Sequence, residues 1–279
     1  MKKWYLLGLL TLSLTLTNCV SVNVSKSETN NKRAQDTQIP IREYSIQSVI
    51  WQQNAAEYRA LCYQAFNLAK LRLDYFLENL EATDKKPAII SDIDETLLDN
   101  SPYNAKMIER DVDYNQEDWK KWTDHATARA IPGAVEFFNY AKSKGVEIFY
   151  VTNRHISEKE TTIKNLEIAG FPEATSENLF LRDETSSKSS RFARVNESYN
   201  VLLYFGDNLS DFKSDEFRVN SSEKRNYLVD EMKKEFGNRF IVLPNPMYGD
   251  WESRGIYEGS YEWTNAQKDS LRRTKLRTY

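Results

Sequence analysis

The sequence predicts an α/β protein built on a Rossmann-like parallel sheet. Beyond residue 85, short and continuous apolar runs alternate with stretches of helical period, which is typical of parallel strands that are buried on both faces and joined by helices. The 279 residues suffice for one sizeable domain or two small ones. The predicted strands are 88–91, 146–151, 178–181, 201–205 and 239–243, and the predicted helices between them are 133–144, 157–169, 188–196 and 222–236.

An N-terminal helix is expected before the sheet, at 45–80, because apolar residues recur there at alternating steps of four, three and seven. The composition carries no global basic field, since the net charge is only −3, and this argues against a nucleic-acid partner. The chain has two cysteines, Cys19 and Cys62. Cys62 falls within the apolar helical pattern, where we expect a buried small side chain.

The first residues are typical of an export signal. Two lysines precede a short apolar stretch at 4–17, which is too short for a comfortable membrane span. The stretch ends at Cys19 in a pattern that resembles the lipobox of bacterial lipoproteins, although Asn18 stands where Gly, Ala or Ser is usual. We therefore expect a lipoprotein signal peptide at 1–18, a lipidated Cys19, a flexible polar tether at 19–40 and a folded domain at 41–279.

Polar, mostly acidic residues follow three of the predicted strands. Because the carboxyl ends of parallel strands meet at one edge of a sheet, four aspartates should converge there. Carboxylates this close repel one another unless a cation neutralises them, and hard oxygen ligands without nearby His or Cys favour Mg²⁺. A divalent ion beside a free carboxylate suits phosphoryl transfer. The four aspartates are Asp92, Asp94, Asp207 and Asp211.

The segment SDIDETLLDNSPY at 91–103 carries the strand–Asp-x-Asp-x-Thr motif and resembles the haloacid dehalogenase superfamily of phosphohydrolases. Together with the motifs at 131–154, 179–192 and 201–212, it is similar to the class C acid phosphatases. These are bacterial lipoprotein phosphatases that are also described as lipoprotein 5′-nucleotidases. The similarity runs from about residue 47 to about residue 251, and it implies a haloacid dehalogenase-like fold.

The resemblance implies a role for each motif residue. Asp92 would be the nucleophile, and Asp94 would act first as general acid and then as general base. Asp207 would be a second carboxylate ligand of the metal, while Asp211 would bind the metal or orient water on it. The implied Mg²⁺ ligands are thus Asp92, Asp94 (through its backbone carbonyl), Asp207 and Asp211, and the implied phosphate-binding residues are Thr152, Asn153 and Lys188.

The resemblance also implies a mainly helical cap, formed by the insert at about 101–131, and an aromatic clamp for a nucleobase made by Trp119 and Tyr248. Stacking tolerates any flat ring, so broad specificity would follow. Each assignment has a purely structural alternative: the aspartates could cap helices or lie in solvated turns, Lys188 could simply be exposed at a helix start, and both aromatics could belong to the core or to a dimer interface.

The predicted function is a Mg²⁺-dependent acid phosphatase that takes small phosphate monoesters, with nucleoside 5′-monophosphates and aryl phosphates as substrates. A dedicated sugar-phosphate phosphatase or phosphotransferase is one alternative. A surface binding lipoprotein on an inactive copy of the fold is another, although such a copy would be expected to have lost Asp92 or Asp207. The expected setting is a homodimer that is exported and lipid-anchored to the bacterial outer membrane, facing the periplasm or the surface.

Overall fold

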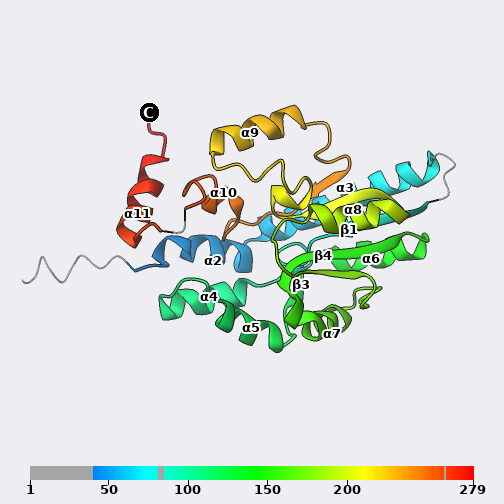
Figure 1. Ribbon diagram of the computed structural model, residues 1–279, viewed down its shortest axis with the longest axis horizontal. Helices are drawn as coiled ribbons and strands as arrows, with labels where there is room; N and C mark the ends of the chain where they lie inside the picture. The colour runs from blue at the N-terminus through cyan, green and yellow to red at the C-terminus, as the bar shows by residue number, and fades with distance from the viewer. Residues whose placement is uncertain (1–39, 81–84, 261) are drawn as a thin grey trace, which may run out of the picture. The chain divides into compact units, whose positions relative to one another are not determined.

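The computed structural model describes residues 40–80, 85–260 and 262–279 (Figure 1). The predicted signal peptide at 1–18, Cys19 and all of the predicted tether except Pro40 lie outside the described residues. Within the described part of the chain, no helix combines the length and apolar character needed to cross a membrane.

The centre of the fold is a five-stranded parallel sheet, which confirms the predicted fold class. Its strand order is β5-β4-β1-β6-β7. The chain enters in the middle at β1, adds two strands on one side and then two on the other, so the winding direction reverses between β1 and β6. Ligands bind outside the carboxyl ends of strands at such a switch point. The strands are β1 (Lys86–Ser91), β4 (Glu147–His155), β5 (Leu179–Arg182), β6 (Tyr199–Gly206) and β7 (Phe240–Val242).

Strand β4 is longer than the predicted 146–151. It pairs again with β5 at His155 and Arg182 after an irregularity in the register. Thr152 and Asn153 therefore lie within the strand rather than just beyond it.

Helices cover both faces of the sheet, in agreement with the continuous apolar strands. Successive side chains of β1 pack on opposite faces of the sheet. Ile89 packs in one core with α3, α6 and α7, and Ile90 packs in a second core with α8. The four helices are α3 (Ala56–Glu78), α6 (Ala134–Ser143), α7 (Lys159–Ala169) and α8 (Ser189–Ser198).

The helical stretch predicted as one element at 45–80 is divided. A short 3-10 turn, η1 (Glu43–Ser45), leads into α2 (Ile46–Asn54), and Ala55 then adopts an extended conformation (φ −76°, ψ 126°) before α3 begins. The two helices have different partners, because α2 packs against α4 whereas α3 packs against the sheet and α6.

The insert between β1 and α6 is mainly helical. It contains α4 (Ser101–Arg110) and α5 (Gln116–Asp124), and the short antiparallel strands β2 (Leu98–Asp99) and β3 (Arg129–Ala130) pair where the chain leaves and rejoins the core domain. Near the C-terminus follow α9 (Ser222–Glu231), which ends before the predicted residue 236, then α10 (Asp250–Ser253) and α11 (Asn265–Thr274).

Candidate active site

Asp92 directly follows β1, the central strand of the sheet, and Asp207 directly follows its neighbour β6. Asp211 reaches the same place because the turn η3 (Leu209–Asp211) folds back on the end of β6, where its carboxylate accepts a hydrogen bond from the Asn208 N–H at 3.0 Å. The turn requires a glycine at the strand end: a Cβ atom on Gly206 would lie 2.3 Å from the Cβ of Asp211.

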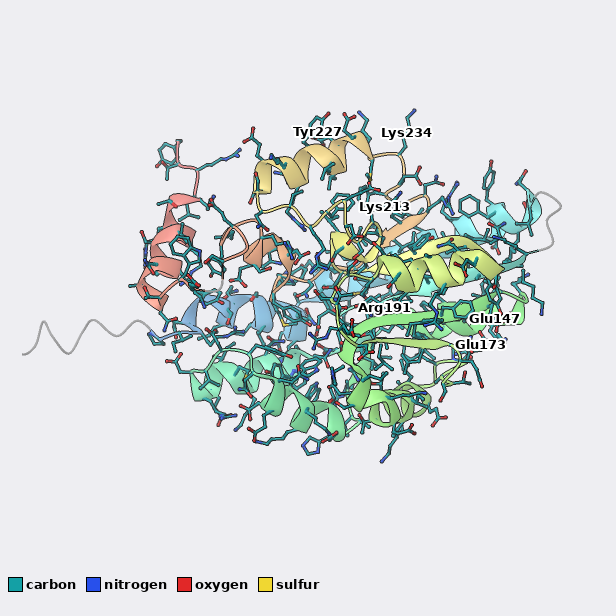
Figure 2. The ribbon with its side chains drawn as sticks, viewed as in Figure 1. Glu147, Glu173, Arg191, Lys213, Tyr227 and Lys234 are labelled. Carbon is teal, nitrogen blue, oxygen red and sulfur yellow. The ribbon has the colours of Figure 1, made fainter. Side chains whose placement is uncertain are left out.

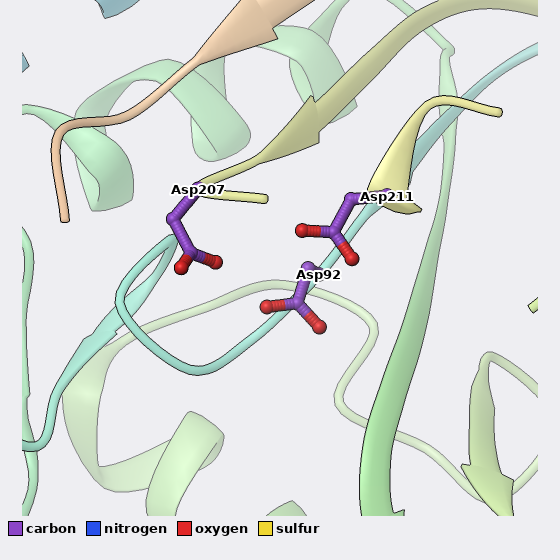
Figure 3. A group of neighbouring side chains, drawn as sticks. All are labelled: Asp92, Asp207 and Asp211. Carbon is purple, nitrogen blue, oxygen red and sulfur yellow. The ribbon is translucent and has the colours of Figure 1, made fainter. Parts of the chain in front are cut away.

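The three aspartates converge at the carboxyl edge of the sheet (Figure 3). One carboxylate oxygen from each lies within 4.8 Å of the others. Burial raises the pKa of Asp92 to about 7 and that of Asp207 well above its usual range, and the neighbouring carboxyl groups act in the same direction. A divalent cation at this point would favour the ionised forms, so this set of hard oxygen donors fits a metal such as Mg²⁺.

Lys188 supplies the only positive charge that the described residues place directly against the cluster. Its Nζ lies 2.5 Å from Asp92 Oδ1 and 2.7 Å from Asp211 Oδ1, and the side chain is almost fully buried. Burial lowers the pKa of Lys188, but the two carboxylates more than offset this and the net shift is upward. Three ionised carboxylates and one ammonium leave two negative charges uncompensated, which matches one divalent ion.

Neutral side chains fix the orientation of Asp207. Asn245 donates to its Oδ2 at 2.8 Å, and the hydroxyl of Thr96 lies 3.3 Å from its Oδ1. The same hydroxyl lies 3.5 Å from Asp92 Oδ2. The threonine of the Asp-x-Asp-x-Thr motif thus connects the two carboxylates that follow β1 and β6.

Asp94 is held apart from the three-carboxylate cluster. The buried guanidinium of Arg154 donates to it from Nε at 3.0 Å and from Nη2 at 2.8 Å, and Asn100 donates from its amide at 2.9 Å. The motif therefore places its two aspartates in different settings: Asp92 lies among carboxylates beside a lysine, whereas Asp94 is fixed by an arginine and an amide.

The predicted phosphate-binding residues of β4 lie beside the cluster. The side chain of Asn153 is exposed and lines the pocket, while Thr152 is fully buried and its hydroxyl accepts from the Arg154 N–H at 3.1 Å. Arg191, labelled in Figure 2, donates to the Thr152 carbonyl and, at 2.9 Å, to Asn153 Oδ1. Arg191 thus fixes the backbone at the end of β4.

A pocket of about 300 Å³ opens over the carboxylates. Both aromatics of the predicted clamp line it. Trp119 is only 8% exposed and packs edge-on against Tyr103, with ring centroids 5.0 Å apart. Tyr248 is half-buried, and its hydroxyl donates to the carboxyl group of Glu95, whose pKa is raised well above the usual range by burial.

Sequence reasoning missed the residues that support these groups. Arg154 stands at the end of the second motif. The one signal that could have marked it is a basic residue at a strand end expected to meet the four predicted aspartates at the same edge of the sheet. Glu95 has a φ of 59°, and nothing in its residue type announces that left-handed conformation. Asn245, Arg191 and Arg42 meet the site only through contacts between distant segments.

Residues 8–251 match the model of a family described as HAD superfamily, subfamily IIIB (Acid phosphatase). The chain belongs to this family. Its members are phosphoric monoester hydrolases, so the match confirms both the resemblance that the four motifs indicated and the enzyme class they predict.

Known structures and sequences agree with the assignment. Two solved structures of the class C acid phosphatase from Bacillus anthracis, one of them a crystal structure with tungstate bound, superpose with TM-scores of 0.82 and 0.81 at 40% identity and cover 86% of this chain and 100% of theirs. Acid phosphatase 1 of Solanum lycopersicum is 27% identical over 59% of this chain, and the stem 31 kDa glycoprotein of Glycine max is 29% identical over 56%. The aligned segments span only 60% and 57% of those two plant proteins.

Proposed function

We propose that this chain is a Mg²⁺-dependent acid phosphatase that hydrolyses phosphate monoesters, with nucleoside 5′-monophosphates and aryl phosphates as its substrates, through an aspartyl-phosphate on Asp92. One observation carries the proposal: the carboxylates of Asp92, Asp207 and Asp211, of which Asp92 and Asp211 are buried, meet Lys188 at the switch point of the sheet, beneath a pocket. The related Bacillus anthracis structure with tungstate bound adds support, since tungstate is a tetrahedral oxyanion like phosphate.

The residues divide the reaction between them. An oxygen of Asp92 attacks phosphorus in line, the bond to the ester oxygen breaks, and Asp94 gives that oxygen its proton. Asp94 then takes a proton from water as the water attacks the aspartyl-phosphate, which releases phosphate and restores Asp92. Lys188, Thr152 and Asn153 would bind the phosphoryl oxygens. The metal, held by Asp92, Asp207, Asp211 and the carbonyl of Asp94, would offset negative charge on the transferring group.

A substrate panel tests this proposal. Nucleoside monophosphates, nicotinamide mononucleotide, sugar phosphates and phenyl phosphate are assayed at acidic and neutral pH, with Mg²⁺ and after chelation. We expect turnover of nucleotides and aryl esters that chelation abolishes and Mg²⁺ restores. Turnover that survives chelation would overturn the metal's role, and turnover confined to one sugar phosphate would favour the dedicated enzyme instead.

The export signal and the lipobox-like sequence at Cys19 support the remaining part of the proposal, which is that the protein is exported and anchored to the outer membrane by lipid. Cys19→Ser should release the protein from membranes while activity in solution is kept. Continued membrane association of that variant would mean that the apolar stretch at 4–17 itself acts as the anchor. The homodimer suggested by the class C resemblance is tested by sedimentation of the released protein.

A further inference from the structure

Arg42 lines the same pocket as the carboxylates, and its guanidinium is short of partners. The residue is only 9% exposed. Among the described residues, its Nε has no hydrogen-bond partner, its Nη2 meets Asn104 Oδ1 only at 3.5 Å, and its Nη1 lies 3.7 Å from the half-exposed Asp113. A guanidinium offers five N–H donors, and a buried one with so few and such long contacts lacks an acceptor.

The main chain holds Arg42 in place, so its position does not depend on those weak side-chain contacts. Its backbone N–H donates to Asp111 Oδ1 at 3.0 Å, at the end of α4. The neighbouring Tyr44 ring is covered by the guanidinium of Arg272 from α11 at 3.9 Å. The N-terminal segment is thus held between the cap and the last helix, which fixes the backbone from which the Arg42 guanidinium reaches the pocket.

Flat and neutral side chains share this part of the pocket. Asn104 is buried, and its amide group donates to the Asn100 carbonyl at 3.2 Å, which leaves its oxygen turned to Arg42. The aromatic pair Tyr103 and Trp119 lies on the same lining. A planar ring that carries an acceptor oxygen would satisfy both the aromatic surface and the guanidinium.

We propose that Arg42 is a specificity-determining residue that binds a carbonyl oxygen on the nucleobase of the substrate, so that 6-oxopurine monophosphates are preferred over adenosine monophosphate. The inference rests on the proposed nucleotide substrates. Arginine pairs in a bidentate manner with the O6 and N7 acceptors of an oxopurine, whereas adenine presents an amino group, itself a donor, in place of O6. Two donors face each other in that case, and the guanidinium stays unsatisfied.

The test uses a matched pair of substrates, inosine and adenosine 5′-monophosphate, with phenyl phosphate as a reference that carries no nucleobase. We expect kcat/KM to favour the inosine nucleotide by about 5- to 150-fold in the parent protein. Arg42→Met should bring this ratio close to 1, mainly through KM for the inosine nucleotide. Arg42→Lys keeps the charge without the planar fork, so its ratio of kcat/KM values should lie between those of the parent and of Arg42→Met. It replaces the methionine variant in the test if that variant folds poorly.

Asp113→Asn is the matched control, because it removes the exposed ion-pair partner of Arg42 without touching the pocket lining. Its ratio should stay within about twofold of the parent ratio. Equal kcat/KM values for the two nucleotides in the parent would overturn the inference and leave the proposed function standing. So would an Arg42→Met variant that loses as much activity on phenyl phosphate as on the inosine nucleotide. Turnover of phenyl phosphate but of neither nucleotide would overturn the proposed nucleotide substrates as well.

Discussion

The floor and the wall of the pocket are built in different ways. The floor is defined as Asp92, Lys188, Asp207 and Asp211. Its side chains come from the ends of β1 and β6, from the turn after β6 and from the start of α8, and each makes short contacts to charged or amide groups. The wall, defined as Arg42, Asn104, Trp119 and Tyr248, comes from four separate segments. Each floor side chain thus has short contacts within the protein, whereas the Arg42 guanidinium of the wall has an N–H donor without an acceptor among the described residues. We infer that the floor fixes the chemistry and the wall selects the substrate.

The largest effect is expected at the floor. Asp92→Asn removes the carboxylate that we propose attacks phosphorus while keeping its shape, so turnover of every phosphate ester should fall by at least about 10⁴-fold. Steady-state assays on a nucleotide and on phenyl phosphate measure this loss, with circular dichroism as the control for folding. Substantial activity in a folded variant would show that another group attacks phosphorus.

Asp94→Asn should have the next largest effect, and one that depends on the ester. General acid catalysis contributes about 10²- to 10⁴-fold, and a nucleotide's alkoxide leaving group needs the proton far more than an activated aryl oxide does. The release of 4-nitrophenol from 4-nitrophenyl phosphate is followed by stopped flow, and its loss in the variant is compared with the loss of nucleotide turnover. If the first burst is lost equally on both ester types, Asp94 organises the site rather than transfers a proton.

Trp119→Ala tests the wall. Loss of about 1–3 kcal/mol of stacking should raise KM for nucleotides by about 5- to 150-fold, with a smaller change for phenyl phosphate. Tyr227→Ala is the control, since that tyrosine is exposed on α9 and does not line the pocket. Because Trp119 also packs against Tyr103, an equal loss on both substrates would assign it to the core of the cap.

Tyr248→Phe should have the smallest effect on substrate use, because the ring is kept and only the hydroxyl bonded to Glu95 is lost. The buried carboxyl group still accepts from the Asn100 N–H at 2.8 Å. The free energy of unfolding should fall by about 1–3 kcal/mol, while KM for nucleotides changes by less than about threefold. A large KM change without loss of stability would mean that the hydroxyl itself contacts the substrate.

The same division explains what the sequence could predict. Continuous apolar strands fixed the sheet, and the polar residues after them located Asp92 and Asp207, because the edge of a parallel sheet follows from its connectivity. The break at Ala55 could not be foreseen, because alanine is the strongest helix former. The chain becomes extended there because α2 packs against α4 whereas α3 packs against the sheet and α6, and these tertiary contacts leave no local signal in the sequence. Arg42 meets Asn104 across 62 residues, and no local pattern records such a contact.

The covalent intermediate is the most direct test of the account. A nucleotide with radiolabelled phosphate is mixed with the parent protein and with Asp94→Asn, and each reaction is quenched in acid on the millisecond scale. We expect protein-bound phosphate on Asp92 in both, with accumulation in the variant because its hydrolysis lacks a base. No bound phosphate in either protein, or label on any residue other than Asp92, would contradict the mechanism.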